Sequence, residues 1–199
     1  MIDLLYSFDQ EYRNSRGSII CGVDEAGRGP LAGPVCCAAV ILDSKTRIEK
    51  LNDSKKLSEK VREQLYEIIV SQCIAYSVIM VDSKEIDSIN ILQATLKGMS
   101  EAIEQLDQKP DLALIDGNKI PDTKIRCINI IGGDAKSASI AAASVLAKVT
   151  RDRYMIKMDA LYPGYGFARH KGYGTAAHYQ AIKNLGKTPI HRYSFTLDH

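Results

Sequence analysis

The chain has 199 residues, of which 45% are hydrophobic, and its 26 Lys and Arg nearly balance its 24 Asp and Glu. This length allows one well-formed hydrophobic core, and no apolar run reaches the roughly 18 residues that a membrane span needs. Acidic residues near the N-terminus, where a secretory signal has basic ones, and five cysteines without a C-x-x-C pair predict a cytoplasmic protein with reduced thiols.

The hydrophobic pattern predicts strands that alternate with helices. In chain order we expect a short helix or arm over 1–16, strands over 18–24 and 34–42 around a glycine-rich loop, a helix capped by Ser58, a strand over 73–81, a helical region from Asp82 or Ser83 to Leu106 that is interrupted or extended near Asn90, strands over 111–118 and 125–131, and helices over 136–159 and 175–186. This order predicts an α/β fold on a mixed sheet.

Two adjacent acids, Asp24 and Glu25, stand where the first strand runs into the glycine-rich loop. Ionised acids at the edge of a core are costly unless hydrogen-bonded, paired or bound to a cation, and glycines let the backbone approach a ligand closely. The combination suggests phosphate-ester chemistry. Because side chains alternate along a strand, we expect Glu25 to lie where the strand breaks into the loop. Taken alone, such a pair more often marks the end of a strand than a catalytic site. The glycines match no nucleotide-binding fingerprint.

Two further acids follow glycine-rich or strand-like segments. Asp116 ends the fourth predicted strand and precedes Gly117, a context in which an acid is most often a turn former. Asp134 precedes the long predicted helix, and its simplest role would be the N-cap of that helix. The residues alone leave both alternatives open.

The string Asp-Glu-Ala-Gly-Arg-Gly-Pro-Leu-Ala-Gly-Pro at 24–34 resembles the first motif of type 2 ribonucleases H, the ribonuclease HII family. Further matching motifs are Asp-Ser-Lys-Lys-Leu-Ser at 53–58, Asp-Gly-Asn at 116–118, Gly-Asp-Ala-Lys-Ser at 133–137, Lys-Val-Thr-Arg-Asp-Arg at 148–153 and His-Lys-Gly-Tyr at 170–173. The resemblance implies a ribonuclease H-like fold, with a mixed five-stranded central sheet flanked by helices. It also implies a catalytic domain over 1–160 and a small helical C-terminal extension over 161–199 that contributes to substrate binding.

The resemblance assigns the catalytic and metal-binding roles to four acids, Asp24, Glu25, Asp116 and Asp134. They would hold two Mn²⁺ or Mg²⁺ ions, for which carboxylate oxygens are suitable ligands. The implied activity is hydrolysis of the RNA strand of RNA–DNA hybrids and cleavage 5′ of single ribonucleotides embedded in duplex DNA. Two-metal-ion catalysis would leave 5′-phosphate and 3′-hydroxyl ends. We expect the protein to act as a monomer.

For substrate binding, the resemblance implies that backbone groups of Gly27, Arg28 and Gly29, with the side chain of Tyr173, read the 2′-hydroxyl that distinguishes RNA from DNA. Candidate phosphate contacts are the basic residues of the matching motifs: Lys55, Lys56, Lys148, Arg151, His170, Lys171 and Arg192. Residues 1–134 carry 16 Lys and Arg against 21 Asp and Glu, whereas residues 135–199 carry 10 against 3. This asymmetry fits either a solvated basic face or a surface that follows phosphates.

Three positions depart from the family pattern: Gly132 where a lysine often stands, Gly174 where a proline often follows the tyrosine, and Tyr193 in place of an arginine. They put details of DNA affinity in question rather than the activity. One alternative is a ribonuclease HIII-type enzyme, which Arg28 and the short N-terminus disfavour. Another is a non-catalytic nucleic-acid-binding module, which would have no reason to keep the four acids. A zinc site at His170 and His178 would lack a third ligand.

Overall fold

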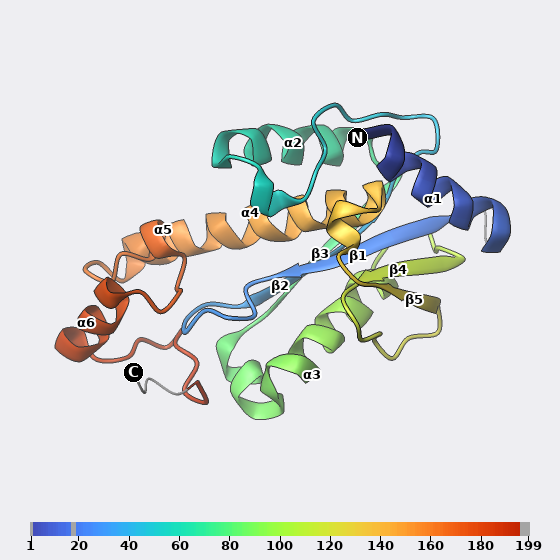
Figure 1. Ribbon diagram of the computed structural model, residues 1–199. Helices are drawn as coiled ribbons and strands as arrows, with labels where there is room; N and C mark the ends of the chain where they lie inside the picture. Colours follow the sequence, from blue (N-terminus) through green and yellow to red (C-terminus); the bar gives the residue numbers. More distant parts are fainter. Residues whose placement is uncertain (1, 17–18, 196–199) are drawn as a thin grey trace.

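The computed structural model describes residues 2–16 and 19–195 (Figure 1). Its elements are α1 (Ile2–Arg16), β1 (Ile20–Ala26), β2 (Val35–Ile41), the 3₁₀ turn η1 (Ser54–Lys56), α2 (Glu59–Gln72), β3 (Ala75–Val81), α3 (Ser83–Glu104), β4 (Leu112–Asp116), β5 (Arg126–Ile130), the 3₁₀ turn η2 (Gly133–Ala135), α4 (Ala138–Leu161), α5 (Phe167–His170) and α6 (Ala176–Leu185). Residue 18 of the first predicted strand and the last four residues of the predicted extension lie outside the described residues.

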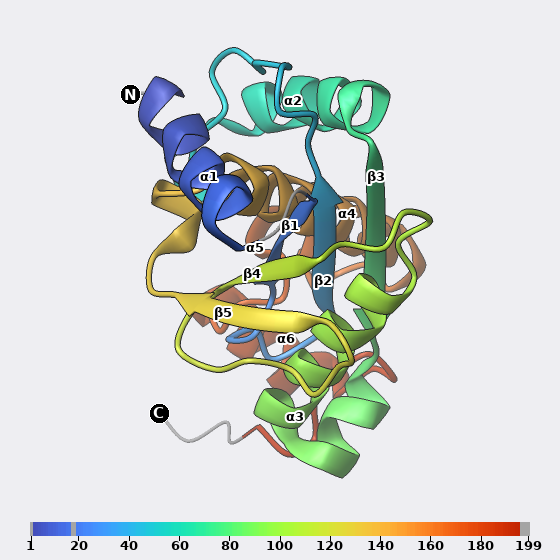
Figure 2. The same cartoon turned by 90° about the vertical axis from the view of Figure 1, so that its right-hand side faces the viewer.

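The five strands form one mixed sheet in the order β3-β2-β1-β4-β5, which confirms the predicted fold class. β1, β2 and β3 pair antiparallel, whereas β4 runs parallel to β1 and β5 parallel to β4. Helix α4 covers one face of the sheet, with α1 beside it on the same face and α2 packed outside it, and α3 covers the other face (Figures 1 and 2). No helix in the described part of the chain is long and apolar enough to cross a membrane.

Helix α4 lies directly against β1 because both elements present small residues at their contact. A Cβ added to Gly22 would come within 2.1 Å of the Ser139 carbonyl carbon, so only glycine permits this approach. The alanines over 141–143 are fully buried in the same core layer. The close packing fixes the position of the sheet edge at which β1 ends relative to the N-terminal half of α4.

Side-chain caps set the helix boundaries, largely as predicted. The Ser58 hydroxyl accepts from the Val61 amide at the start of α2, and the Asp82 carboxylate accepts from the Glu85 amide at the start of α3. Within α3, Asn90 has a φ of 66°, and its side-chain oxygen accepts from two following amides. Asn90 therefore restarts the helix after a kink, which confirms the predicted interruption.

The C-terminal part of the described chain packs on the loop between β1 and β2. Leu31 of this loop donates from its amide to the Gly172 carbonyl and accepts at its carbonyl from the Arg192 amide, and the Gly33 amide donates to the Ile190 carbonyl. Phe167 and Ile182 share a buried cluster with Leu31. The loop and residues 161–195 are thus built as one unit, and the division into domains at residue 160 stays an interpretation.

Candidate active site

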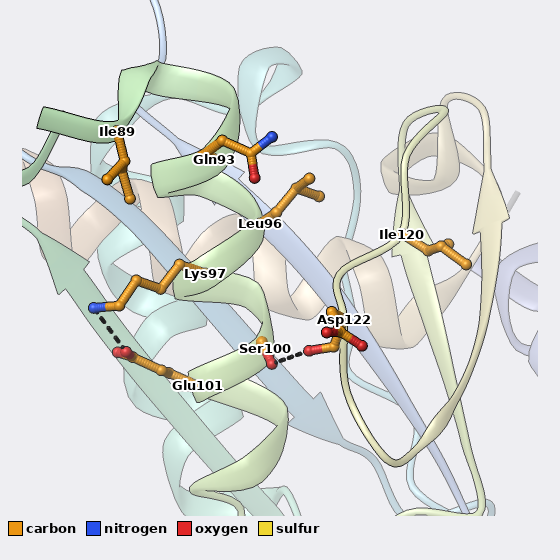
Figure 3. Close-up of a pocket in the computed structure, with 8 residues that line it drawn as sticks. All are labelled: Ile89, Gln93, Leu96, Lys97, Ser100, Glu101, Ile120 and Asp122. Carbon is orange, nitrogen blue, oxygen red and sulfur yellow. Dashed lines mark hydrogen bonds and ion pairs between the residues drawn. The ribbon is translucent and has the colours of Figure 1, made fainter. Parts of the chain in front are cut away.

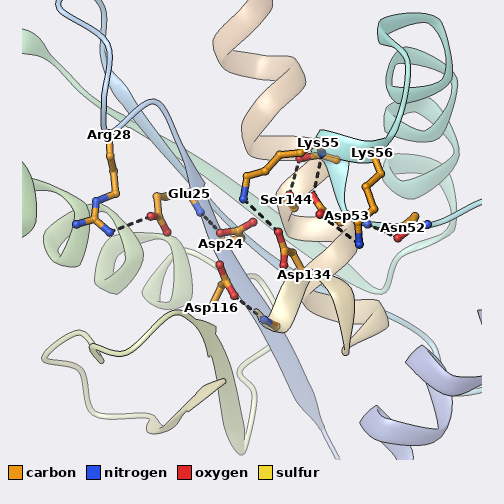
Figure 4. A network of polar contacts seen from close by, with 12 residues as sticks. Asp24, Glu25, Arg28, Asn52, Asp53, Lys55, Lys56, Asp116, Asp134 and Ser144 are labelled. Atoms are coloured by element: carbon orange, nitrogen blue, oxygen red, sulfur yellow. Dashed lines mark hydrogen bonds and ion pairs between the residues drawn. The ribbon is translucent and has the colours of Figure 1, made fainter. Parts of the chain in front are cut away.

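Three carboxylates from separate elements meet at the C-terminal ends of the inner strands β1 and β4 (Figure 4). Asp24 lies near the end of β1, Asp116 ends the parallel neighbour β4, and Asp134 lies in η2 just before α4. One carboxylate oxygen of each lies within 4.8 Å of those of the other two. The parallel pairing of β1 with β4 brings the two strand-end acids together, and η2 adds the third.

Each carboxylate is oriented by a polar neighbour. The Glu25 amide donates to Asp24 Oδ1 at 2.7 Å, and the Gly133 amide donates to Asp116 Oδ1 at 2.6 Å. Lys55 Nζ lies 3.3 Å from Asp134 Oδ2. These contacts fix the directions of the three side chains while a single lysine pairs with the group.

The acids are held in an unfavourable electrostatic environment. Burial raises the pKa of Asp24 well above its usual value, and the charges of Glu25 and Asp116 raise it further. Burial and the charge of Asp116 also raise the pKa of Asp134, although Lys55 acts in the opposite direction. Three oxygen donors that repel one another at this spacing suit a divalent cation, which prefers hard oxygen ligands. The residues present therefore fit the metal ions that the sequence predicts.

Glu25 differs from the expectation. It does not lie in a break of the strand, because β1 stays paired with β2 as far as Ala26 opposite Cys36, and the chain leaves the ladder at Gly27 with a φ of 96°. Alternation therefore directs Asp24 towards α4 and Glu25 towards α3. The Glu25 carboxylate lies 3.4 Å from Arg28 Nη1, and burial raises its pKa although Arg28 lowers it.

Asp134 does not cap the long helix. Helix α4 begins at Ala138, and Ser137 is its N-cap, with a hydroxyl that accepts from the Ile140 amide. Because Ser137 fills the capping position three residues later, the Asp134 side chain is free to join the other two acids.

Sequence reasoning missed two serines behind the acids. Ser144 on α4 hydrogen-bonds Asp24, which lowers the pKa of that carboxyl, and its hydroxyl lies 2.7 Å from that of Ser54 in η1. Ser144 stands seven residues, or two helical turns, after the cap Ser137, so it faces the same side of α4. That spacing was the available signal.

A pocket of about 220 Å³ opens beside the acids. It is lined by residues 25–29 at the end of β1 and the start of the loop, and by Ser54, Lys55, Ser144, Lys148 and Tyr173. The Tyr173 side chain is half exposed, and its ring edge lies 3.8 Å from where a Cβ of Gly29 would be. The residues predicted to read a ribose are thus in one pocket next to the carboxylates.

On the other side of Glu25, hollows follow α3. One contains Glu25, Arg28 and Asp116 beside the apolar side chains of α3. The next, about 630 Å³, lies between α3 and residues 120–122 (Figure 3). Lys97 and Glu101, which line this hollow, form an ion pair with each other at 3.0 Å. It offers no group of acids comparable with the one at the sheet edge.

The predicted basic contacts divide into two sets, and the first set lies at or near the surface. Lys148 Nζ pairs with Asp152 at 2.8 Å, Lys56 pairs with Asp53 at 3.7 Å, and Lys171 lies 3.8 Å from Glu59. The His170 ring is fixed between the Tyr165 carbonyl and the Gly172 amide. Lys55 also belongs to this first set. Within the set, only Lys55 and Lys148 line the pocket beside the acids.

Arg151 and Arg192 form the second set, and the expectation that they contact phosphate is wrong. Each is 1% exposed. Arg151 donates to the carbonyls of Pro34, Ala32 and Lys171, and Arg192 donates to those of Gly33, Arg28 and Gly27. Because the loop between β1 and β2 wraps around both guanidiniums, their donors are used inside the protein.

The three departures from the family pattern lie outside the group of acids. Gly132 adopts a φ of 64° at the start of η2, and a side chain there would meet no atom within 4 Å. Gly174 lies against Tyr179, and the Tyr193 ring is exposed with Lys187 Nζ 4.7 Å from its centroid. Their effect on DNA affinity stays a prediction.

Comparisons with known proteins agree with this geometry. The family model described as Ribonuclease HII matches residues 21–198. The chain is 54% identical to a ribonuclease HII of Acetivibrio thermocellus, covering 95% of this chain and 74% of that protein, and 58% identical to one of Coxiella burnetii, covering 89% and 88%. The ribonuclease HII in the structure of its complex with PCNA from Archaeoglobus fulgidus superposes with a TM-score of 0.78 at 27% identity, covering 91% of this chain and 96% of that one.

Proposed function

The chain belongs to the ribonuclease HII family and is a ribonuclease H endonuclease, and we propose that it acts on RNA–DNA hybrids and on duplex DNA with embedded ribonucleotides. It would cut the RNA strand of the former and the 5′ side of the ribonucleotide in the latter. Family membership decides against the ribonuclease HIII-type enzyme and the non-catalytic binding module. The observation that carries the proposal is the meeting of Asp24, Asp116 and Asp134 within 4.8 Å beside a pocket that contains a glycine-rich turn and Tyr173.

We infer that Asp24, Asp116 and Asp134 hold the divalent cations, Mn²⁺ or Mg²⁺, and that Glu25 completes the set from the α3 side. When bound, two such ions would activate water and stabilise the charge on the phosphate and the leaving 3′ oxygen. The chain's own contribution is to hold the carboxylates convergent. The amides of Glu25 and Gly133 support this, because each donates to a carboxylate of the group.

Selection of RNA would rest on the pocket beside the acids. Backbone groups of Gly27, Arg28 and Gly29 would approach the ribose from one side and Tyr173 from the other. A 2′-hydroxyl both donates and accepts hydrogen bonds, so a deoxyribose leaves these groups without a partner. Lys55 and Lys148 also line this pocket, and their side chains would contact flanking phosphates.

The test uses three end-labelled duplexes: an RNA–DNA hybrid, DNA with one ribonucleotide, and DNA alone. With Mg²⁺ or Mn²⁺ the protein should cut the first two, leave 5′-phosphate ends and spare the third, and EDTA should stop cleavage. The Asp24→Asn variant should be inactive, whereas the control Asp107→Asn, which neutralises an exposed acid away from the site, should match the wild type. Cleavage of the all-DNA duplex at a similar rate, or full activity of Asp24→Asn, would contradict the proposal.

A further inference from the structure

Arg192 reaches from the C-terminal segment into the underside of the glycine-rich turn. Its Nη2 donates to the Gly27 carbonyl at 2.5 Å, its Nη1 to the Arg28 carbonyl at 2.7 Å, and its Nε to the Gly33 carbonyl at 3.0 Å. The guanidinium therefore binds two consecutive peptide groups of the turn and a third farther along the same loop.

These bonds determine the direction in which two amides point. In a trans peptide the C=O of one residue and the N–H of the next point in opposite directions, and the described chain has no cis peptide bond. With the carbonyls of Gly27 and Arg28 held against the guanidinium, the amides of Arg28 and Gly29 must point the other way. Over 2–16 and 19–195, neither amide donates a hydrogen bond to the protein. Both residues line the pocket beside the acids.

The buried charge of Arg192 strengthens this arrangement. Every hydrogen-bond partner of its guanidinium in the described chain is a backbone carbonyl. Burial and the neighbouring Arg151 lower the pKa of Arg192 to about 9, so the side chain is still a cation at neutral pH. A cation on a carbonyl oxygen polarises the peptide group and makes its N–H a better donor. The two outward amides are thus both oriented and activated.

Building on the proposed function, we propose that Arg192 is a positioning residue for ribose recognition. It fixes the two peptide groups 27–28 and 28–29 with their N–H groups towards the 2′ oxygen of the target nucleotide. It contacts no substrate itself. Its loss should therefore lower the rate of cleavage at a ribonucleotide without weakening the attraction between the protein and the duplex backbone.

The fork of the guanidinium is the property that matters, because a lysine ammonium cannot hold three carbonyls in this geometry. Arg192→Lys keeps the charge and removes the fork. The control is Arg169→Gln, which removes an exposed positive charge from the same part of the chain. A milder variant, Phe195→Leu, keeps Arg192 but removes the ring that lies 5.0 Å from its guanidinium carbon.

Two quantities separate positioning from electrostatic attraction. The first is the single-turnover rate of cleavage of a duplex with one ribonucleotide. The second is the inhibition constant of the same duplex made entirely of DNA, which reports backbone affinity alone. We expect Arg192→Lys to lower the rate at least tenfold and to change the inhibition constant less than twofold. Phe195→Leu should lower the rate by a smaller factor in the same pattern, and Arg169→Gln should leave the rate unchanged.

An unchanged rate in Arg192→Lys, or a rate and an inhibition constant that worsen together, would overturn the proposal. Thermal unfolding of each variant shows whether it is folded, and if Arg192→Lys is not, Phe195→Leu decides by the same two criteria. Failure of the wild type to cut the ribonucleotide duplex would instead remove the proposed function, which is a different outcome.

Discussion

Two groups of buried or half-buried charges lie on either side of the glycine-rich loop, and the protein treats them in opposite ways. The acids Asp24, Asp116 and Asp134 repel one another, and within the described chain their ion-pair partner is Lys55 alone. The cations Arg151 and Arg192 are more deeply buried, yet their donors are matched by backbone carbonyls of the loop and of Lys171. Charge is left uncompensated where we propose that a cation binds, and it is compensated where the guanidiniums hold the backbone of the loop.

The difference shows what each group contributes. Uncompensated buried charge lowers stability and is retained only where function needs it. Compensated buried charge orders the segment that surrounds it, because each carbonyl that loses its donor would be left unsatisfied inside the protein. The loop thus lies between a group of acids whose charges are largely uncompensated and a pair of arginines whose hydrogen-bond donors have backbone acceptors.

The largest expected effect follows from removing charge from the acids. Asp24→Asn should lower the cleavage rate on the order of a thousandfold, because it removes a ligand and charge stabilisation at the reacting phosphate. Without divalent cations the same variant should unfold at a higher temperature than the wild type, because repulsion within the group is relieved. Steady-state cleavage and thermal unfolding in EDTA measure the two changes.

Added Mg²⁺ sharpens this prediction. A cation that binds only the folded state stabilises it, so the unfolding temperature of the wild type should rise with Mg²⁺ concentration. The rise should be smaller in Asp24→Asn, whereas in the control Asp107→Asn it should be as large as in the wild type. Equal responses of all three proteins would mean that the three carboxylates do not bind the cation.

Removing charge from the arginine pair should have the opposite effect on stability. Arg151→Met leaves the carbonyls of Ala32, Pro34 and Lys171 without their donor. We expect the free energy of unfolding to fall by about 3 kcal/mol, measured by urea denaturation. Arg153→Met on the same helix removes a partly exposed guanidinium with carboxylate partners and should cost less than about 1 kcal/mol. Similar losses in both variants would mean that the buried Arg151 contributes no more to stability than the surface residue Arg153.

The sequence was sufficient for the sheet and for most helix boundaries because these depend on local patterns. Ser58 and Asp82 cap their helices through amides three residues away, and Asn90 interrupts α3 through its own side chain. Apolar segments of the sequence located all five strands. Each of these features is determined within a few residues of the chain.

The positions of the site residues could be predicted only in part, because they depend on distant segments. Glu25 stays in the ladder because β2 pairs with β1 as far as Ala26, which no local pattern shows. Arg151 and Arg192 look like surface cations in the sequence, since nothing there reveals that loop carbonyls far away in the chain accept from them. The roles of the four acids came from the family resemblance and stay predictions until the variants are measured.

A third buried charge tests whether compensation, rather than the sign of the charge, governs stability. Asp9 of α1 is buried, yet its carboxylate accepts from the Ser137 hydroxyl and from the amide and hydroxyl of Ser139. Asp9→Ala should therefore lower the free energy of unfolding by about 2 kcal/mol while the cleavage rate stays unchanged. Urea denaturation and the cleavage assay test the two halves. A gain in stability like that expected for Asp24→Asn would show that buried acids destabilise this protein whatever their partners.

The smallest effect is the dependence of stability on pH, to which the two sides of the loop contribute with opposite signs. His191 is buried in the C-terminal segment, with Nδ1 accepting from the Thr188 amide and Nε2 3.1 Å from Nε2 of His178. Burial and the neighbouring His178 lower the pKa of His191 to about 4. Between pH 7 and pH 6 the unfolded chain therefore binds more protons at this position, and stability falls by about 0.7 kcal/mol. Burial raises the pKa of Asp24, so the folded state binds more protons there and stability rises as the pH falls.

Variants should separate these two contributions. His191→Gln removes the histidine contribution, so its free energy of unfolding should fall less than that of the wild type, or rise, between pH 7 and pH 6. Asp24→Asn removes the opposing contribution of the acid, so its free energy of unfolding should fall at least as steeply as that of the wild type. Asp107→Asn, the exposed control, should follow the wild type. Urea denaturation in EDTA is measured at pH 7.0, 6.5 and 6.0, in steps of roughly half a unit. It gives the slope of the free energy of unfolding against pH for each variant. If His191→Gln were as steep as the wild type, folding would not lower the pKa of His191, and the buried histidine would not oppose the acids in the dependence of stability on pH.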